Sequence, residues 1–367
     1  MHRGIVAEID LEAVSANLRT VKALVGSKAV IAIVKADAYG HGAVDVSKAL
    51  VRAGADYLAV AFTDEAVKLR ETGITDPIIV LFDPDIRDIL KYDLIPVLGD
   101  RKTALAVSRE AEKLGKRIPV HIKVDTGMGR LGLTEGPAHE ILEISAEKGI
   151  VIEGIMSHLS EADLDDPSFT KVQLDLFSVL KTELLENGLG IKMFHIANSA
   201  AVMNMPEAHF DAVRPGLMLY GYSPCGKQVA SHGSPLQTVM TAKARFISVR
   251  RIRAASPISY ARTFVAKRES LIGVVAVGYA DGFSTRFSNN AEVLVKGKRA
   301  PVVGRVCMDL TMIDLTEIDG VTENDEVIII GSQGSEKIGA DELARRIQAI
   351  PYEILTSLGN KAKRIYI

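Results

Sequence analysis

The chain has 367 residues, of which 47% are hydrophobic and 25% are charged, and its formal net charge is -2. This composition is that of an ordinary globular protein, and the near-neutral charge excludes a strongly basic surface for nucleic acid or anionic lipid. A chain of this length usually forms two domains, at least one of them large. Apolar runs such as 271–280 are too short for a membrane span, which needs about 20 residues.

Cysteine usage and the N-terminal segment indicate the compartment. Two cysteines, Cys225 and Cys307, cannot build a disulfide framework, and no Cys and His spacing is typical of a metal site. We therefore expect a reducing compartment and no bound metal. The chain reaches Glu8 and Asp10 before any apolar run develops, so we expect no signal peptide. These features favour a cytoplasmic protein.

Short β-branched runs alternate with longer helical patterns between about residues 10 and 221, which is typical of βα units around a parallel sheet. The candidate strands are 31–34, 57–60, 78–81, 95–98, 120–124, 152–156, 193–196 and 212–214. Eight such strands predict a TIM-type (β/α)8 barrel, in which functional side chains lie at the carboxyl ends of the strands. A doubly wound sheet is the alternative, and the lack of a glycine-rich dinucleotide motif disfavours it.

Polar residues follow several of these strands. Lys35 directly follows the apolar run 29–34, and desolvation there would lower its pKa and make it a nucleophile or a base. A lysine that extends into solvent is the alternative. The barrel topology would bring further polar residues to the same face: Lys123, Arg130, His158, the Asn198–Ser199 pair and Arg214.

The pattern changes past about residue 223 to short alternating strands with glycine and proline between them. The candidate strands are 241–247, 271–277, 292–295, 312–315 and 326–330, and a helical pattern covers 340–348. We predict that residues 1–225 form the barrel domain and residues 226–367 a mostly-β domain. The opening strand 4–9 precedes the barrel, and we expect residues 1–9 to pair with the β domain.

Seven motifs, in order along nearly the whole chain, carry a family resemblance. They are VKADAYGHG at 34–42, KVDTGMGRLG at 123–132, HIANSA at 195–200, VRPG at 213–216, ISYART at 258–263, VGYADG at 277–282 and GRVCMD at 304–309. With these motifs the chain resembles the alanine racemases, pyridoxal 5'-phosphate (PLP) enzymes that join a barrel to a β domain and work as head-to-tail homodimers with shared active sites. Ala261 departs from the pattern, because the family usually has glycine there.

The resemblance assigns a two-base mechanism. Lys35 would form the internal Schiff base with PLP and act as a base on one face of the substrate Cα, and Tyr260 of the partner subunit would act on the opposite face. Arg214 would face the pyridine nitrogen of PLP and keep it largely unprotonated. His158 would stack on the cofactor ring or link Arg214 to Tyr260.

The resemblance also assigns residues to the substrate carboxylate. Arg130 and the backbone amide of Met308 would bind it, and Asp309 would position the loop of Met308. Lys123 is N-carboxylated in many family members, and the resulting anion would orient Arg130, which an unmodified ammonium would repel. Tyr279 would line the entrance together with Tyr352.

The cofactor phosphate needs backbone amides and hydroxyls. The residues that match the family's set are Tyr39, Ser199, the amides of Gly216 and Leu217, and Tyr352. Asn198 belongs to the same cofactor site by resemblance, but an asparagine there is equally typical of a cap for a helix that starts at Ser199.

Taken singly, these residues allow ordinary interpretations. A tyrosine such as Tyr260 is more often a packing residue, Arg214 could pair with a carboxylate at the barrel rim, His158 could be a satisfied polar group, and Lys123 could turn outward.

The motifs together predict an enzyme that interconverts L-alanine and D-alanine and supplies D-alanine for peptidoglycan. A serine or broad-specificity amino acid racemase of the same fold is the second hypothesis, and the motifs do not separate the two well. A non-catalytic PLP-binding protein is less favoured, because such proteins lack the β domain. Decarboxylases of the same architecture use a cysteine from the partner subunit and lack the Tyr260 motif.

Overall fold

The computed structural model describes residues 4–225 and 235–367. They form two compact units, one made of residues 14–38, 43–225 and 235–237 and the other of residues 4–13, 39–42 and 238–367. We call the first the barrel unit and the second the C-terminal unit. Residues 1–3 of the predicted barrel domain and 226–234 of the predicted β domain lie outside the described residues.

The barrel unit is built on one sheet of eight parallel strands, in the order β8-β7-β6-β5-β4-β3-β2-β9. These strands are β2 (Ala29–Ile33), β3 (Tyr57–Val60), β4 (Ile78–Val80), β5 (Ile95–Leu98), β6 (Ile118–Lys123), β7 (Ile150–Met156), β8 (Met193–His195) and β9 (Ala212–Val213). The sheet nearly closes, because the amide of Asp211 donates to the carbonyl of Phe194 at 3.1 Å beside β8 and β9. The predicted barrel is confirmed.

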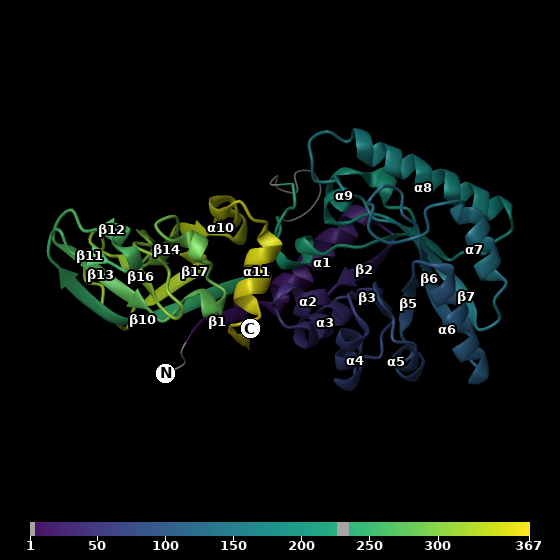
Figure 1. The fold of residues 1–367 in the computed structure, drawn as a ribbon, viewed down its shortest axis with the longest axis horizontal. Coiled ribbons are helices and arrows are strands. Elements are labelled where there is room, and N and C mark those ends of the chain that lie inside the picture. The colour runs from purple at the N-terminus through teal and green to yellow at the C-terminus, as the bar shows by residue number, and fades with distance from the viewer. Residues whose placement is uncertain (1–3, 226–234) are drawn as a thin grey trace. The chain divides into compact units, whose positions relative to one another are not determined.

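Helices pack outside these strands (Figure 1). They are α3 (Ala43–Arg52), α4 (Thr63–Glu71), α5 (Ile86–Lys91), α6 (Arg101–Lys113), α7 (Pro137–Ser145), α8 (Ser168–Glu186) and α9 (Ser199–Asn204), and α1 (Leu11–Val25) precedes β2. In α3 the buried residues include Val46, Ala49 and Leu50, whose spacing of three and four positions gives one apolar face toward the sheet. Strands β3, β4 and β5 are buried along their whole length. A rigid apolar core therefore supports the carboxyl ends of the strands.

The C-terminal unit is mostly β, as the sequence predicts. Its strands are β1 (Val6–Ile9), β10 (Met240–Ile252), β11 (Pro257–Ile258), β12 (Phe264–Val265), β13 (Ser270–Val275), β14 (Glu292–Val295), β15 (Lys298–Pro301), β16 (Thr311–Asp314), β17 (Glu326–Gln333), β18 (Glu336–Ile338) and β19 (Lys363–Tyr366). Two helices, α10 (Ala340–Ile347) and α11 (Pro351–Gly359), complete it. The opening strand β1 pairs antiparallel with β10 and parallel with β19.

The long strand β10 organises this unit, as Figure 1 shows. Its first half pairs with β1 and β17, and its second half pairs with β13, with a bulge between Phe246 and Ser248 in that pairing. A bulge increases the local twist of a strand. Strand β13 in turn pairs with β16, and the loop that precedes β16 contains Met308.

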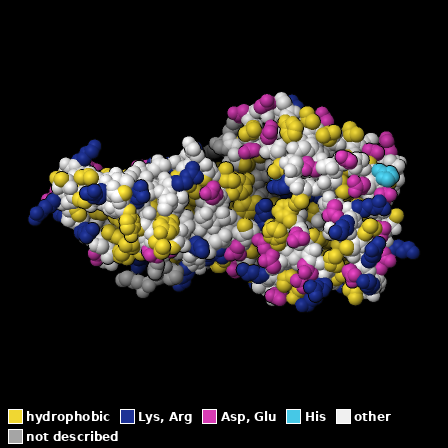
Figure 2. Space-filling model, in the orientation of Figure 1, with side chains coloured by type: hydrophobic (Ala, Val, Ile, Leu, Met, Phe, Trp, Pro, Cys, Tyr) yellow, Lys and Arg dark blue, Asp and Glu magenta, His cyan; other side chains and the backbone are white. Residues whose placement is uncertain are grey.

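The surface of the barrel unit carries charged side chains of both signs, interspersed over the face that Figure 2 shows. No helix among the described residues is long and apolar enough to cross a membrane.

Candidate active site

Lys35 stands directly after β2, at the start of an unusual turn, α2 (Lys35–Tyr39). Within this turn Ala36, Asp37 and Ala38 have φ angles of 52°, 53° and 54°, which is the left-handed helical region. For residues other than glycine this conformation costs roughly 1–2 kcal/mol each. The turn therefore needs support from the surrounding structure.

Two carboxylates supply that support. The amide of Ala36 donates to Glu65 Oε1 at 2.6 Å, and the amide of Ala43 donates to Asp37 Oδ1 at 2.7 Å. The other Glu65 oxygen accepts the amide of Ala61 at 2.7 Å, so this carboxylate ties the turn to the start of α4. These bonds fix the direction in which the Lys35 side chain leaves the backbone.

The environment of Lys35 favours its neutral amine. Burial lowers the pKa of Lys35 below its ordinary value of 10.5, the nearby Arg130 guanidinium lowers it further, and the Glu65 carboxylate partly opposes this. In a larger fraction of the protein molecules, Lys35 is therefore a neutral amine that can act as a nucleophile or base near neutral pH.

Lys123 ends β6 and points into the barrel unit, where it is only 3% exposed. This burial excludes the outward orientation that the sequence left open. Burial, followed by the charges of Arg130 and Arg214, lowers the pKa of Lys123 to about 8, and Asp125 opposes the shift. Lys123 is thus a buried amine that is partly neutral at physiological pH.

The loop after β6 is organised around the Asp125 carboxylate. Its Oδ1 accepts the amides of Gly127, Met128 and Gly129 at 2.9, 2.7 and 3.1 Å, and its Oδ2 accepts the amide of Arg130 at 2.9 Å. Burial raises the pKa of Asp125, but these four bonds outweigh it and lower the pKa overall. Both oxygens of the Asp125 carboxylate accept hydrogen bonds from backbone amides. These bonds fix the backbone position from which the exposed Arg130 side chain extends.

Arg214 is 4% exposed and belongs to a series of buried, hydrogen-bonded side chains. Its guanidinium donates to His195 Nδ1 at 2.8 Å, to the carbonyl of Ser157 at 2.6 Å and to His158 Nδ1 at 3.2 Å. His195 Nε2 in turn lies 2.9 Å from His121 Nδ1. No carboxylate takes part, so the barrel-rim ion pair that is the ordinary interpretation of Arg214 is absent among the described residues.

The chemistry of Arg214 sets the tautomers along this series. A guanidinium only donates, so the nitrogens that face it on His195 and His158 must accept, and both rings carry their proton on Nε2. Burial, together with the Arg214 charge, holds the pKa of both rings well below the usual 6.5, so both remain neutral. The His158 Nε2–H is therefore a fixed donor.

A second group of polar atoms lies where β8 and β9 end. Ser199 Oγ accepts the amide of Gly216 at 2.8 Å and that of Met218 at 3.4 Å, beside the short helical turn η2 (Leu217–Tyr220). Asn198 Oδ1 accepts the amides of Ala200 and Ala201 at 3.1 Å each, so Asn198 is the cap of α9. The capping role that the sequence left open for Asn198 is what the structure shows. Backbone amides and a hydroxyl gathered in this way are typical of an anion site.

Tyr39 and Tyr352 come together in the C-terminal unit, with ring centroids 5.5 Å apart. Tyr39 is buried, and Tyr352 stands in the first turn of α11. Burial, and then the proximity of Tyr352, raises the pKa of Tyr39 above its usual 10. Its hydroxyl therefore stays protonated.

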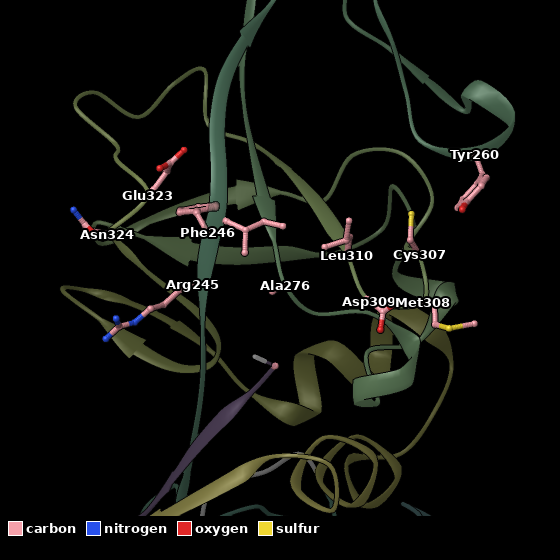
Figure 3. Close-up of a pocket in the computed structure, with 12 residues that line it drawn as sticks. Arg245, Phe246, Tyr260, Ala276, Cys307, Met308, Asp309, Leu310, Glu323 and Asn324 are labelled. Carbon is pink, nitrogen blue, oxygen red and sulfur yellow. The ribbon is translucent and has the colours of Figure 1, made fainter. Parts of the chain in front are cut away.

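Tyr260 and Met308 lie on the surface of the C-terminal unit, 70% and 54% exposed. They line one cavity of about 780 Å³ together with Cys307 and Asp309, as Figure 3 shows. The exposure of Tyr260 in this unit does not fit the packing tyrosine that it would be in isolation. Tyr279 is also exposed, at 45%.

Hydrogen bonds join the three loops that carry these residues. Ser259 Oγ donates to the carbonyl of Arg305 at 2.6 Å, and the amide of Tyr279 donates to the carbonyl of Cys307 at 3.1 Å. Ala261, beside Tyr260, has a φ of 56°, in the region that favours glycine. This conformation explains why the resembling family usually has glycine at this position. Alanine adopts the same conformation here with some strain in its backbone.

The structure distributes the predicted site residues between the units. The barrel unit holds Lys35, Lys123, Arg130, His158, Asn198, Ser199, Arg214, Gly216 and Leu217; the C-terminal unit holds Tyr39, Tyr260, Tyr279, Met308, Asp309 and Tyr352. Three residues at the barrel mouth had no role in the sequence interpretation, namely Glu65, Phe82 and His195. His195 opens a quoted motif, and Phe82 follows a predicted strand, so their positions at strand ends were the available signal. Among the described residues, no three His, Cys, Asp or Glu side chains cluster as metal ligands would.

Two family models cover almost the whole chain. The model described as "Alanine racemase, N-terminal domain" matches residues 9–224, and "Alanine racemase, C-terminal domain" matches residues 239–366. The chain belongs to the alanine racemase family. The resemblance seen in the seven motifs is thereby confirmed, and the chain is an enzyme of the isomerase class.

Curated family members support this over the full length. The alanine racemase of Thermodesulfovibrio yellowstonii is 51% identical over 372 residues, covering 100% of this chain and 99% of the relative. The alanine racemase of Carboxydothermus hydrogenoformans is 42% identical and covers 100% of both chains.

Solved alanine racemase structures share the fold. The Clostridium difficile 630 structure matches with a TM-score of 0.93 and 33% identity over 100% of this chain and 96% of that chain. The Bartonella henselae alanine racemase, solved with covalently bound pyridoxal phosphate, matches with a TM-score of 0.89 and 32% identity over 100% of both chains.

Proposed function

We propose that this chain interconverts L-alanine and D-alanine with pyridoxal 5'-phosphate as its cofactor. The observation that carries the proposal is the gathering of Lys35, Lys123, Arg130 and Arg214 in the barrel unit, where the charge of Arg130 helps to lower the pKa values of the other three. Among the described residues, none of the four has a carboxylate in ion-pair contact. A site with excess positive charge fits a ligand that brings phosphate and carboxylate groups.

The donor set fits the cofactor. Lys35 offers the amine for covalent attachment, and Ser199 with the amides of Gly216 and Leu217 offers a phosphate site. By family resemblance, Tyr39 and Tyr352 contribute to phosphate binding and Asn198 supports the site as the cap of α9. When bound, pyridoxal phosphate withdraws electrons from the substrate Cα and so makes its proton removable.

Arg214 would bind the ring nitrogen of the cofactor. Burial, and then the Arg130 charge, lowers the pKa of Arg214 to about 9, which still leaves it protonated near neutral pH. A charged guanidinium cannot accept a proton, so it keeps the ring nitrogen unprotonated and limits the spread of charge from the Cα. Side reactions at other carbons are thereby suppressed.

The two proton carriers would come from two copies of the chain. Lys35 serves one face of the Cα, and the exposed Tyr260 of a second copy serves the other. His158 supports this second base, because its fixed Nε2–H can donate to the phenolic oxygen and stabilise the phenolate. The working form is then a head-to-tail homodimer with shared sites, in which Met308 and Tyr279 of the second copy approach the substrate and Asp309 holds the Met308 loop.

Lys123 would act after modification. Its neutral amine adds to carbon dioxide, forming a carbamate and releasing one proton, and the new anion pairs with Arg130. Arg130 is then oriented to bind the substrate carboxylate.

The names of the relatives favour alanine over serine as the substrate, because the curated members described above are called alanine racemases. We further propose that the D-alanine product serves peptidoglycan synthesis in the cytoplasm, a compartment consistent with the free thiols of Cys225 and Cys307.

The assignment of Lys35 is tested by chemical trapping. Holoenzyme treated with borohydride should retain the cofactor covalently on the Lys35 peptide, and Lys35→Ala should show no such adduct. The control is Lys148→Ala, an exposed lysine of the same unit. An undiminished adduct in Lys35→Ala would refute the assignment.

A further inference from the structure

One aromatic ring is shared by three cationic side chains of the barrel unit. Phe82 follows β4, and its ring centroid lies 5.6 Å from Lys35 Nζ, 5.3 Å from Lys123 Nζ and 5.6 Å from Arg130 Cζ. All three distances fall within the roughly 6 Å over which the negative face of a ring attracts a cation. A single phenylalanine therefore contacts the proposed base Lys35, the proposed carboxylate ligand Arg130, and Lys123, which is proposed to orient Arg130.

The carboxylates nearest to these cations are already occupied. Glu65 accepts backbone amides through both of its oxygens, and Asp125 accepts four amides of its own loop. Within residues 4–225 and 235–367 no ion pair joins either group, or any other carboxylate, to Lys35, Lys123 or Arg130. The ring is the partner that the three cations have in common.

Contacts of its backbone and of its ring hold Phe82 in a fixed position beside the three cations. Its amide donates to the carbonyl of Ala61 at 2.9 Å, which continues the pairing of β3 and β4 beyond the regular strands. Its ring packs on Phe62 with centroids 6.1 Å apart. Phe62, Phe82, Lys123 and Arg130 line one cavity of about 910 Å³, so the ring borders the space in which a ligand would meet these cations.

We propose that Phe82 is a positioning residue, whose ring gathers Lys35, Arg130 and the unmodified Lys123 in the cofactor-free protein and so places them for attachment of the cofactor, modification of Lys123 and binding of the substrate carboxylate. This inference rests on the proposed function for the identity of the ligands. The contact of the ring with the three cations does not depend on it. Three like charges repel, and the electron-rich ring offsets part of that repulsion without neutralising any of them.

The test reduces the negative electrostatic potential on the face of the Phe82 ring while nearly preserving the shape of the side chain. Full-length protein carrying phenylalanine, 4-fluoro-, 3,5-difluoro- or 3,4,5-trifluorophenylalanine at position 82 is labelled with ε-13C-lysine and titrated by NMR in carbon-dioxide-free buffer, with PLP removed. Losing the attraction disfavours the charged amine, so the pKa of Lys123 and Lys35 should fall stepwise, by about 0.4 to 1 pKa unit in total. The other charged groups that face the two lysines stay the same across the series: Arg130, Arg214, Asp125 and Glu65.

The matched control is the same fluorinated series at Phe62. That ring touches Phe82 and lines the same cavity, but no cation of the described chain lies over it. Its series should leave both lysine titrations unchanged. A flat titration at position 82, or equal changes at both positions, would overturn the proposal.

A second readout uses the holoenzyme. In the trifluoro variant at position 82, KM for alanine should rise about 2- to 5-fold with a smaller change in kcat, since the ring faces Arg130, which is proposed to bind the carboxylate. An unchanged KM would contradict the positioning role. If even the unmodified protein fails to racemise alanine, the proposed function is wrong, while the lysine titrations still decide the role of Phe82.

Discussion

Lys123 is the residue whose charge is least compatible with its surroundings. It is 3% exposed, and burial together with Arg130 and Arg214 lowers its pKa from 10.5 to about 8. The unfolded chain therefore holds a proton on this group up to about pH 10.5, whereas the folded chain releases it near pH 8. Below pH 8 the unmodified ammonium destabilises the fold fully, and the penalty disappears as the pH rises through this window.

Removing this charge should stabilise the unmodified protein at neutral pH. In carbon-dioxide-free buffer, Lys123→Met should raise the free energy of unfolding at pH 7 by about 1–2 kcal/mol, and the gain should shrink toward pH 10. Urea unfolding at pH 7 and pH 9.5 measures it, with the exposed Lys102→Met as control. A variant that is less stable than the parent at pH 7 would show that other interactions in the fold offset the cost of burying the Lys123 ammonium.

At the scale of elements, the left-handed turn α2 is the feature that places Lys35. Four consecutive non-glycine residues, 36–39, hold a positive φ, and Glu65 at the start of α4 bonds to Ala36 within this turn and to Ala61 beyond β3. Strain stored at a functional position persists only when its surroundings enforce it. Glu65 is therefore a positioning residue for Lys35.

Replacing Glu65 by glutamine should release the turn. The amide nitrogen of glutamine cannot accept a backbone N–H, so the bond to the exposed Ala36 amide or to the half-buried Ala61 amide is lost, which costs about 0.5–1.5 kcal/mol. Thermal unfolding should show this loss, and cofactor attachment at Lys35 should slow. Asp64→Asn, which removes an exposed charge from the same helical turn, should change neither. Equal effects of the two substitutions would mean that Glu65 acts only through its negative charge at the start of α4, and not through its hydrogen bonds to Ala36 and Ala61.

The elements show what sequence can and cannot predict. All eight barrel strands lie where buried β-branched runs predict them, because strand formation follows local hydrophobic pattern. The hand of the turn after Lys35 was not predictable, since Ala36, Asp37 and Ala38 normally adopt right-handed conformations and the bond to Glu65 comes from 29 residues away.

The same limit applies to the site. Its residue types and their strand-end positions were predictable from the motifs. The capping by Asn198 is local and was one of the two interpretations that the sequence allowed. The inward direction of Lys123 and the shared contacts of Phe82 depend on packing between distant strands, which a single sequence does not encode locally.

At the scale of the whole molecule, the proposed site requires two copies. Lys35 belongs to the barrel unit, whereas Tyr260 and Met308 are large, exposed side chains around a cavity of the C-terminal unit. Exposed apolar surface beside a cavity is typical of an interaction face. A symmetric dimer would use this face twice and form two equivalent sites.

Hybrid dimers test this sharing. Lys35→Ala and Tyr260→Phe homodimers should both lack racemase activity, but a dimer with one chain of each kind has one intact and one doubly defective site. After random exchange of equal amounts, about a quarter of the wild-type activity should return. Mixing each variant with itself is the control. No recovery, with hybrids demonstrated by mass spectrometry, would place the whole site within one chain.

The most direct measurement of the two-base claim is exchange of the substrate α-proton in deuterated water, recorded separately for L-alanine and D-alanine with the Tyr260→Phe holoenzyme. Because Lys35 remains on one face and the opposite face loses its proton carrier, exchange should be lost far more for L-alanine than for D-alanine. Tyr279→Phe, an exposed tyrosine of the same unit, should leave the ratio of the two rates close to that of the wild type. Equal losses of exchange for both enantiomers in Tyr260→Phe would contradict the two-base account.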